Sequence, residues 1–424
     1  MVIKMKSSGD IGNRWYWIVA ASLFMVMMIN CGVGFYSLSL FVDPIADAFC
    51  ITKGDVALLY TFYSLGSALA AVGLHRILKK VSLRTVLLLG GILSTGGYML
   101  FVAAGSLRVM FLGGILIGAS TVFAGTAVCQ LAIAKWFLEK RSMVTGIVAA
   151  ASGVGTAVGG PVIGAAIRQV GWRQAFLLIG GMVFFFAFAQ VFVIFRSSPA
   201  DVGVVPYGVS TENVADQMES EGVPLRAVVK TRCFFLFTCG MLITSLIYQV
   251  VSLYQSSILL ERGYSAELAA VCLSVFAIFD MSSKALSGIV ADRRGFRTVT
   301  CYCALALAAA FIMIRCITSA LGAFIFSALL GFWPTILVLY GVTVSIALFG
   351  RKYLAEYISY TQTVMCCCSM IGMPVIRALY NMKGGFSAIL DFALALVIVF
   401  LAIMLLLLRP SNLAQNKVYG GMGK

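Results

Sequence analysis

The stretches GGPVIGA at 159–165 and GMPVIRA at 372–378 share five of their seven residues, at an offset of 213 in the numbering. The same offset pairs RTV at 84–86 with RTV at 297–299. It also pairs Gly118 with Gly331, and no gap is needed anywhere in this alignment. Agreement at this one fixed spacing, the repeat offset, indicates a tandem duplication within the chain. The sequence therefore predicts two halves that contain the same helices in the same order.

The composition indicates what surrounds these halves. Of the 424 residues, 61% are apolar and 11% are charged, whereas a typical soluble domain has roughly 25% charged residues. A soluble protein of this length could not bury so much apolar surface, which excludes a soluble enzyme, a disordered chain and a secreted disulfide scaffold. We therefore expect an all-α membrane protein whose solvent is mostly lipid.

Twelve apolar stretches are long enough to cross a bilayer core of about 30 Å. They lie near 15–42, 55–75, 85–105, 109–134, 142–167, 174–195, 232–260, 265–290, 298–318, 320–349, 354–380 and 387–408. The only long interruption is the polar stretch 196–230, which contains three prolines and five carboxylates. The predicted organisation is an N-terminal six-helix bundle at 1–195, a cytoplasmic linker at 196–230 and a C-terminal six-helix bundle at 231–424.

The basic residues predict the orientation of these spans. With the N-terminus in the cytoplasm, 22 of the 31 Lys and Arg residues fall on the inner side, eight fall on the outer side, and one lies within a span. Short cytoplasmic loops carry such an excess in membrane proteins. The net charge of +15 is therefore a topology signal and does not indicate nucleic-acid binding. We expect a multi-pass protein of the cytoplasmic (plasma, or cell inner) membrane with both termini in the cytoplasm.

The cysteines and the histidine give no sign of a metal site. The chain has twelve cysteines and one histidine, and their spacing is not typical of metal ligands. Almost all of the cysteines lie inside apolar stretches, where cysteine behaves as a small hydrophobic residue. We expect no metal and no cofactor.

The stretch GIVADRRGFR at 288–297 follows the eighth span. It fits the loop pattern G-x-x-x-D-R-x-G-x-R at Gly288, Asp292, Arg293, Gly295 and Arg297. In this motif the chain resembles the major facilitator superfamily. The resemblance implies twelve transmembrane helices in two six-helix bundles related by a parallel repeat, with substrate bound near the midplane and alternating access around it. It also implies that Asp292 helps to latch the cytoplasmic side.

The first-half copy of this loop departs from the pattern. Lys79, Lys80 and Ser82 stand where Asp, Arg and Gly are expected, and His75 replaces the first glycine. The first-half latch is therefore not expected to work in the same way. His75 has two interpretations, a pH sensor or an interfacial histidine with ordinary hydrogen bonds.

Two charged residues, Asp280 and Lys284, lie well inside the eighth span. A spacing of four residues places both side chains on one face of a helix. Counting back from Asp292 at 1.5 Å per residue places Lys284 about 12 Å and Asp280 about 18 Å from the cytoplasmic end, near the membrane centre. Charges at this depth are costly and are functional hypotheses by default. One interpretation is a self-neutralising pair that only positions the helix.

The other interpretation is that Lys284 binds an anionic substrate and Asp280 carries a proton. A substrate carboxylate that competes for the ammonium group weakens its hold on Asp280, so that Asp280 binds a proton more readily. Substrate binding and proton binding then favour each other, which is the thermodynamic basis of symport. If Asp280 instead stays ionised, the carrier returns only when loaded with another anion, which gives exchange.

The stretch FDMSSK at 279–284, followed by Gly288, resembles the span 8 pattern D-x-x-x-R of the monocarboxylate transporter family. The oxalate–formate antiporters are a close relative of that family. The resemblance implies a proton-handling role for Asp280 and a carboxylate-binding role for Lys284. Lysine is a departure, because it offers a point charge where arginine offers a planar fork. The predicted function is proton-coupled monocarboxylate transport, with organic-anion exchange of the oxalate–formate type as the alternative.

Further candidates for substrate contact are polar and aromatic residues in spans that line the central cavity in this fold. Hydroxyl and amide groups suit a carboxylate, and aromatic rings suit its apolar tail. Ordinary hydrogen bonding between helices is the alternative for each of them. The candidates are Asn30, Tyr36, Tyr60, Tyr63, Gln130, Tyr248, Gln249, Ser252, Gln255, Trp333, Tyr340 and Tyr360.

Arg377 is a separate candidate. The residue that matches it in the first half is Gly164, within nearly identical surroundings. A large cation therefore replaces a small packing residue toward the outer end of the eleventh span. Two interpretations are an anion-attracting or gating role and an arginine whose head group reaches the membrane interface.

Other classes of function are less well supported by the sequence. No phosphate-binding loop is visible, which argues against ATP-driven transport. No nucleophile motif, metal spacing or His/Asp/Glu cluster indicates an enzyme. A non-transporting receptor and an exporter of amphipathic compounds stay open. The expected partners are a small organic anion, protons and the lipid bilayer, with no nucleic acid, and the chain is expected to act as a monomer.

Overall fold

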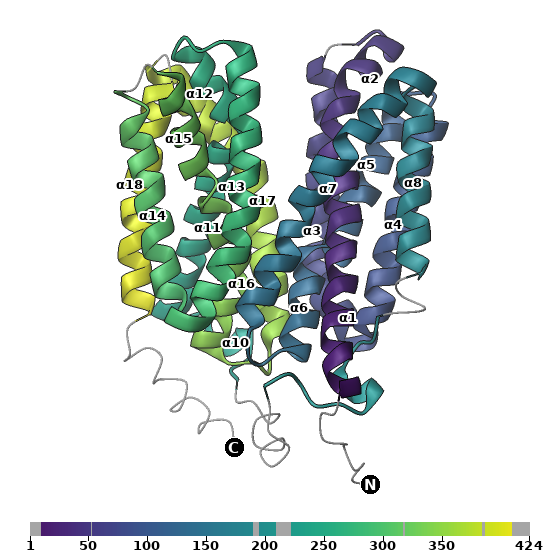
Figure 1. Ribbon diagram of the computed structural model, residues 1–424, viewed down its shortest axis with the longest axis vertical. Coiled ribbons are helices and arrows are strands. Elements are labelled where there is room, and N and C mark those ends of the chain that lie inside the picture. Colours follow the sequence, from purple (N-terminus) through teal and green to yellow (C-terminus); the bar gives the residue numbers. More distant parts are fainter. Residues whose placement is uncertain are drawn as a thin grey trace. The chain divides into compact units, whose positions relative to one another are not determined.

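The computed structural model describes residues 10–51, 53–189, 195–208, 222–316, 319–383 and 386–408. Apart from two isolated β-bridges, the regular elements in these residues are helices (Figure 1). The chain divides into two compact units, Met1–Met218 and Glu219–Lys424. This division falls inside the predicted linker, and the predicted domain ends at 195 and 231 stay predictions.

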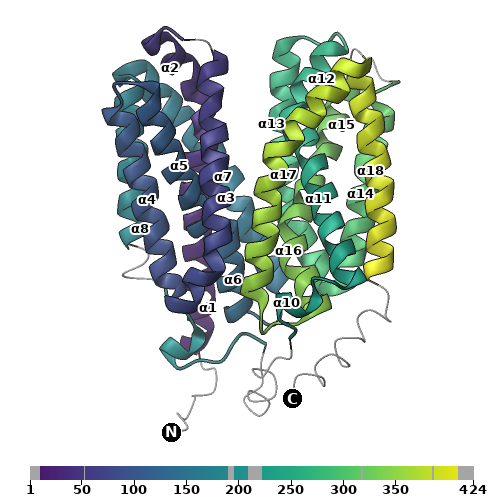
Figure 2. The ribbon, with the colours of Figure 1, turned by 180° about the vertical axis from the view of Figure 1, so that it is seen from behind.

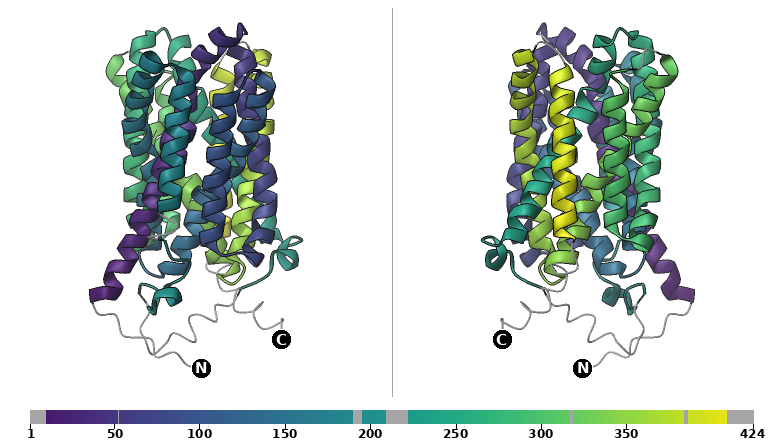
Figure 3. Two further views of the ribbon diagram at one scale, coloured as in Figure 1. Left: turned by 90° about the vertical axis from the view of Figure 1, so that its right-hand side faces the viewer. Right: turned by 90° about the vertical axis from the view of Figure 1, so that its left-hand side faces the viewer.

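The first unit contains six spans. The views in Figure 3 show its long helices running close to one common direction. Its elements are α1 (Asp10–Val26), the π-helical segment η1 (Met27–Phe35), the 3₁₀ segment η2 (Tyr36–Phe41), α2 (Val42–Phe49), α3 (Lys53–Lys80), α4 (Leu83–Ala103), α5 (Leu107–Phe123), α6 (Thr126–Trp136), α7 (Arg141–Val170), α8 (Trp172–Ala189) and the short η4 (Pro199–Val202).

The second unit repeats this plan. Figure 2 shows α17 lying along α11, and the two helices are in contact. The elements of the unit are α10 (Leu225–Val228), α11 (Arg232–Leu253), α12 (Gln255–Glu261), α13 (Ala266–Arg294), α14 (Phe296–Met313), α15 (Ala320–Leu330), α16 (Trp333–Phe349), α17 (Leu354–Lys383) and α18 (Phe386–Leu407).

Within the described residues, eleven spans are long and apolar enough to cross a membrane. They correspond to eleven of the twelve predicted spans. The twelfth, expected at 354–380, is the helix α17, whose 30 residues correspond to about 45 Å of helix. Large apolar side chains such as Leu69, Phe185 and Leu321 are 64%, 67% and 68% exposed. Such exposure fits a chain whose outer surface faces hydrocarbon.

Several spans are broken, and the breaks follow the duplication in part. In the first span α2 begins at Val42, and in the seventh span α12 begins at Gln255, the position that matches Val42 at the repeat offset. The tenth span breaks between α15 and α16, at Gly331 and Phe332. Pro334 lies in the first turn of α16, where a missing N–H costs no intrahelical hydrogen bond. The tenth span is therefore broken just before this proline.

The loop motif and its first-half counterpart, which departs from the pattern, form their turns by different means. Gly295 joins α13 to α14 with φ +82°, a conformation that favours glycine, and its N–H donates to the Ala291 carbonyl at 3.0 Å. Ser82, its first-half counterpart, has φ −71° and accepts a hydrogen bond from the Thr85 N–H at 3.3 Å. A side-chain cap at the start of α4 thus replaces the left-handed glycine.

The two described ends of the linker pack against the units. At the first end, the Tyr16 hydroxyl donates to the Val205 carbonyl at 2.5 Å, and the Trp136 indole N–H donates to the Arg196 carbonyl at 3.2 Å. At the second end, the Val223 N–H donates to the Phe349 carbonyl at 3.0 Å. Each described end of the linker is therefore anchored to the unit that it belongs to.

Candidate substrate and proton site

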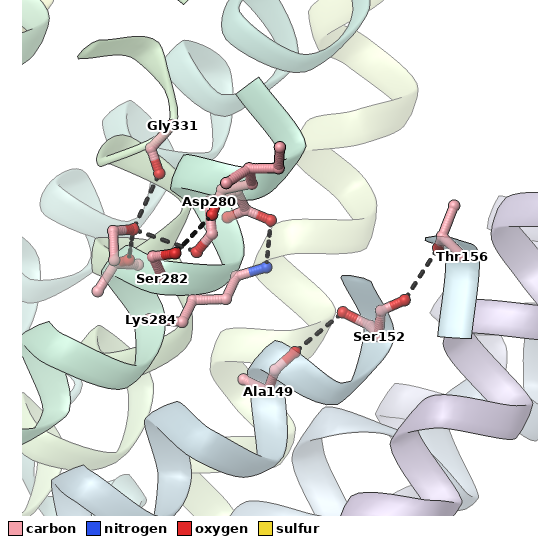
Figure 4. Close-up of polar contacts among 10 residues, drawn as sticks. Ala149, Ser152, Thr156, Asp280, Ser282, Lys284 and Gly331 are labelled. Atoms are coloured by element: carbon pink, nitrogen blue, oxygen red, sulfur yellow. Dashed lines mark hydrogen bonds and ion pairs between the residues drawn. The ribbon is translucent and has the colours of Figure 1, made fainter. Parts of the chain in front are cut away.

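The charged pair predicted in the eighth span forms within α13. The Lys284 ammonium donates to Asp280 Oδ2 at 2.7 Å (Figure 4), one helical turn apart. The Lys284 side chain is 9% exposed and the Asp280 side chain is 17% exposed. The pair thus has little contact with solvent. In such surroundings the attraction between the two charges is stronger than at a wet surface.

Asp280 lies at the midpoint of its helix. It is fourteen residues from Ala266 and fourteen from Arg294, the two ends of α13, which corresponds to about 21 Å in each direction. A helix of this length exceeds the hydrocarbon core, so its midpoint is the position farthest from both aqueous phases.

The two oxygens of the Asp280 carboxylate differ in their surroundings. Oδ2 accepts from Lys284, whereas Oδ1 is shielded and has no hydrogen-bond partner within the described residues. An ionised carboxylate can accept several hydrogen bonds, and leaving one buried oxygen unpaired is costly. Oδ1 is therefore the oxygen of this carboxylate that can still accept a hydrogen bond.

Asp280 also lies at a close crossing between α13 and the break in the tenth span. A Cβ atom added to Gly331 would stand 2.8 Å from the Asp280 backbone nitrogen and 2.9 Å from the Phe276 carbonyl oxygen. Such distances leave room for glycine only. The end of α15 therefore rests directly on the backbone at Asp280.

The first unit contains the same crossing without the charges. A Cβ atom added to Gly118 would stand 1.9 Å from the Tyr63 carbonyl oxygen and 3.1 Å from the Ser67 nitrogen. Gly118, Tyr63 and Ser67 match Gly331, Phe276 and Asp280 at the repeat offset. The residue that matches Lys284 is Ala71. The charged pair thus occupies one of two copies of the same helix crossing.

Candidates in the seventh span make hydrogen bonds between helices. The Gln249 amide donates to the Cys368 carbonyl at 3.1 Å, and the Gln255 amide donates to Ser327 Oγ at 2.8 Å. Both side chains are buried, and their carbonyl oxygens have no partner within the described residues. Ser252 Oγ is likewise shielded without a partner there, and Tyr248 is half-buried. Each of these oxygens can still accept a hydrogen bond.

Candidates in the tenth span belong to the packed interior of the second unit. The Trp333 indole donates to the Thr244 carbonyl at 3.3 Å, and the Tyr340 hydroxyl donates to the Phe237 carbonyl at 2.9 Å. Both side chains are fully buried. Their burial does not support direct contact with substrate. Tyr360 is half-buried, and its hydroxyl lies 3.0 Å from that of Thr238.

In the first unit, two tyrosine candidates come together. The Tyr63 ring stacks on Phe35 with centroids 4.4 Å apart, and the Tyr60 ring meets Phe35 edge-on at 6.4 Å. Both tyrosines line a small apolar pocket. The Tyr63 hydroxyl also donates to Thr121 at 2.8 Å. The pocket is bounded further by Leu38, Phe41, Val42, Ile45, Val56, Leu59, Phe101, Gly114, Ile117 and Phe176.

The remaining candidates are scattered. Asn30 is buried in the π-helical segment η1, and its carbonyl oxygen has no partner within the described residues. Gln130 is buried in α6. The side chains of Tyr36 and Arg377 lie outside the described part of the structure. Among the loop-motif residues, Gly288 is buried within α13, whereas Asp292, Arg293, Gly295 and Arg297 are exposed where α13 meets α14.

Sequence reasoning missed four residues at the two equivalent crossings, one in each unit. They are Ser67 and Ala71 in the first unit and Ser283 and Thr335 in the second. Serine, threonine and alanine are common inside membrane helices and carry no signal on their own. The repeat offset could have identified Ser67 and Ala71, because it aligns them with the charged pair.

Comparison with known proteins identifies the family. The model of the Major Facilitator Superfamily matches residues 16–339. The chain belongs to this superfamily, whose members are transporters and not enzymes, and it is an integral multi-pass membrane protein. The crystal structure of the superfamily transporter FucP in the outward conformation has the same fold, with a TM-score of 0.69 at 15% identity over 92% of this chain and 99% of that one. The predicted fold class is confirmed.

Relatives named as transporters match at between 24% and 28% identity. Monocarboxylate transporter 11 of Mus musculus is 26% identical over 299 residues, which cover 68% of this chain and 62% of that protein. Monocarboxylate transporter 12 of Mus musculus is 28% identical over 40% of this chain and 35% of its own length. The oxalate:formate antiporter of Oxalobacter formigenes is 24% identical over 401 residues, 93% of this chain and 92% of that protein. The chain thus spans less than two thirds of the two mouse relatives, and the resemblance found in the sequence is confirmed.

Proposed function

We propose that this protein is a secondary active transporter of small organic anions, most simply of monocarboxylates, driven by coupled proton movement through alternating access. The observation that carries the proposal is the largely buried Asp280–Lys284 pair at the midpoint of α13, in which one carboxylate oxygen has no partner within the described residues. Its relatives include proteins named as monocarboxylate transporters and an oxalate:formate antiporter, which support an anionic substrate.

Lys284 is the proposed anion-binding group. It is a buried ammonium whose single contact among the described hydrogen bonds and ion pairs is with Asp280. An ammonium group has three donors, so a substrate carboxylate can join Asp280 on it or displace it. The attraction between the ammonium group and a substrate carboxylate is large here, because the ammonium group is removed from water and charges interact more strongly in such surroundings.

Asp280 is the proposed proton carrier. In the absence of substrate, the ammonium group favours the ionised carboxylate. When a substrate carboxylate engages Lys284, two negative charges compete for one positive charge, and protonation of Oδ1 relieves the conflict. Proton binding and anion binding then raise each other's affinity, as linkage requires. A carrier with this property moves the two together.

Organic-anion exchange is the second candidate, and one observation favours it. The match to the oxalate:formate antiporter extends over nearly the full length of both chains. In exchange, Asp280 stays ionised, and the unloaded transporter does not switch its binding site from one side of the membrane to the other. A second anion on Lys284 is then needed for each return step.

The location and orientation form part of the same proposal. The protein resides in the cytoplasmic membrane as a monomer with both termini in the cytoplasm, since 22 of its 31 Lys and Arg residues then lie on the inner side. In this orientation the exposed loop residues Asp292, Arg293 and Arg297 face the cytoplasm and serve as the conformational latch. Asn30, Tyr60, Gln249, Ser252 and Arg377 are secondary candidates for substrate contact.

The test is uptake of labelled monocarboxylates and dicarboxylates into proteoliposomes, with and without an inward proton gradient and with counter-anion inside. Lys284→Ala is expected to abolish uptake and exchange. Asp280→Asn is expected to abolish the response to the proton gradient and to leave exchange measurable. Lys352→Ala is the matched control, because Lys352 is exposed between α16 and α17.

Two results would contradict the proposal. Normal organic-acid uptake by Lys284→Ala would contradict the anion-binding role of Lys284. Saturable binding of organic acids by the wild-type protein, with no flux under any gradient, would instead indicate a receptor.

A further inference from the structure

Two hydroxyl groups join α13 to α16 directly beside Asp280. Ser283 Oγ lies 2.6 Å from Thr335 Oγ1 and donates to the Gly331 carbonyl at 2.9 Å. It also lies 3.2 Å from the Asp280 carbonyl oxygen. Ser283 and Thr335 are 2% and 0% exposed. Each hydroxyl has one proton, so the relay that satisfies all groups runs from Thr335 to Ser283 to Gly331.

The relay ends on the break in the tenth span. Gly331 follows α15, and helix ends leave carbonyl groups without an intrahelical partner. Ser283 supplies the donor that the Gly331 carbonyl needs. Because Gly331 has no side chain, the same segment also lies directly against the Asp280 backbone nitrogen. The backbone at Asp280 is thus held in two ways. Gly331 is in close contact with its nitrogen, and the Ser283 hydroxyl lies 3.2 Å from its carbonyl oxygen.

The first unit shows what the crossing requires without a charged pair. There Ser67 Oγ donates to the Gly118 carbonyl at 2.8 Å. Ser67 matches Asp280 at the repeat offset. In the second unit the carboxylate occupies this position, and Ser283, three residues later on the same helix face, provides the hydroxyl. The hydrogen bond to the glycine carbonyl is kept, and the Asp280 side chain is left for Lys284.

We infer that Ser283 and Thr335 are positioning residues for Asp280, and that they link its protonation to the break in the tenth span. The inference rests on the proposed function, in which Asp280 carries the proton. A movement of α15 or α16 is transmitted through Gly331 and Ser283 to the backbone that holds the carboxylate. It therefore changes the contact of 2.7 Å between Asp280 Oδ2 and Lys284 Nζ.

Few other charges act on Asp280 from the helices that pack on α13. The helix α15 has no titratable side chain, and in α16 the hydroxyl of Tyr340 is engaged by the Phe237 carbonyl. In α14 the Tyr302 hydroxyl contacts Ser287 Oγ, Arg297 is exposed, and Cys301 and Cys303 are free thiols. In α12 the Glu261 carboxylate accepts from the Phe386 N–H at 2.9 Å. Lys284 is the one charged group in direct contact with Asp280 among the described residues.

The experiment measures the protonation of Asp280 and transport in the same variants. The carboxyl band of Asp280 in infrared difference spectra of purified protein is identified by its loss in Asp280→Asn and followed across pH. Ser283→Ala and Thr335→Val remove the relay, and Thr335→Val keeps the side-chain shape. Ser283→Thr keeps a hydroxyl, and Ser67→Ala removes the equivalent hydrogen bond at the uncharged crossing.

A looser pair gives the ammonium group a weaker hold on the carboxylate, so Asp280 takes up its proton at higher pH. The midpoint of the infrared titration is expected to rise by about 0.5 to 1 pH unit in Ser283→Ala and Thr335→Val, the equivalent of one hydrogen bond. The pH at half-maximal uptake is expected to move by the same amount. Ser283→Thr and Ser67→Ala are expected to titrate as the wild-type protein.

Equal loss of activity in Ser283→Ala and Ser67→Ala, with no shift of either midpoint, would show a packing role only and would overturn the inference. If Ser283→Ala does not fold, an unshifted midpoint in Thr335→Val overturns it equally. A shifted infrared midpoint in a protein that transports no organic anion would support the positioning role and refute the proposed function.

Discussion

Phe137 and Gly350, which occupy matching positions of the two halves at the repeat offset, each form a β-bridge with one end of the linker. Phe137 pairs with Tyr207, and Gly350 pairs with Gly222. Each of the two residues directly follows the span that ends at Trp136 or Phe349. The duplication therefore includes the place where each unit holds the linker, although the two linker ends differ in sequence.

The anchor of the first linker end can be tested at Tyr16. Its buried hydroxyl donates to the Val205 carbonyl at 2.5 Å. Tyr16→Phe leaves that carbonyl without its donor and is expected to lower the stability of the purified protein by about 1–2 kcal/mol, seen as a lower Tm in detergent. The control is Tyr207→Phe, whose hydroxyl contacts the exposed Lys140 at 3.1 Å. An equal Tm loss in both variants would show that the anchor contributes no more than a surface contact.

The close helix crossings predict a contrast between two glycines. A Cβ atom at Gly118 would meet the Tyr63 carbonyl at 1.9 Å, whereas one at Gly181 would meet nothing within 4 Å. Gly118→Ala is expected to destabilise the protein by about 1–3 kcal/mol, because α3 and α5 must move apart. Gly181→Ala is expected to be neutral or to stabilise by up to about 1 kcal/mol through helix propensity. Thermal unfolding of both variants in one detergent measures the difference in stability. A Gly181→Ala variant less stable than Gly118→Ala would contradict the close contact between α3 and α5.

The charged pair can be converted into its first-half counterpart. Lys284→Ala alone leaves Asp280 as a buried unpaired charge and is expected to cost up to about 3 kcal/mol at pH 8. Adding Asp280→Ser recreates the residues Ser67 and Ala71 and is expected to restore most of that stability. Neither variant is expected to transport organic anions. Thermal unfolding of the two variants beside the wild-type protein measures the difference, and a double variant no more stable than Lys284→Ala would contradict it.

The same comparison has a pH dependence. An unpaired buried carboxyl group binds a proton more readily in the folded protein than in the unfolded chain. The deficit of Lys284→Ala relative to the double variant is therefore smallest at low pH and grows as pH rises. Urea or thermal unfolding between pH 5 and 8 measures this deficit, and a constant deficit would show that Asp280 is not an unpaired charge in that variant.

The proposed orientation is testable with the natural cysteines. Cys50 and Cys316 are exposed near the ends of α2 and α14, on the side expected to face outward, whereas Cys129 and Cys272 are buried. A membrane-impermeant maleimide is expected to label the first two in intact cells and neither of the buried pair. The double variant Cys50→Ser, Cys316→Ser provides the background. If Cys50 and Cys316 were labelled only in permeabilised cells, the result would indicate the opposite orientation.

Several features of this protein follow from local sequence alone. The length of each apolar stretch predicts the spans, and the repeat offset predicts two like halves. The spacing of four residues predicts that Asp280 and Lys284 meet on one face of a helix, which the distance of 2.7 Å confirms. In each case the property depends on residues whose relation is visible along the chain itself.

Other features depend on which helix faces which. The relay of Ser283, Thr335 and Gly331, the burial of Trp333 and Tyr340, and the anchoring of Tyr16 on the linker join residues far apart in the chain. In a soluble protein, an apolar stripe marks the side of a helix that faces the core. In lipid, the side that faces hydrocarbon is as apolar as the side that faces a neighbouring helix. The sequence by itself therefore determined the spans, the repeat and the charged pair, and only the tertiary structure decided which residues hold that pair in place.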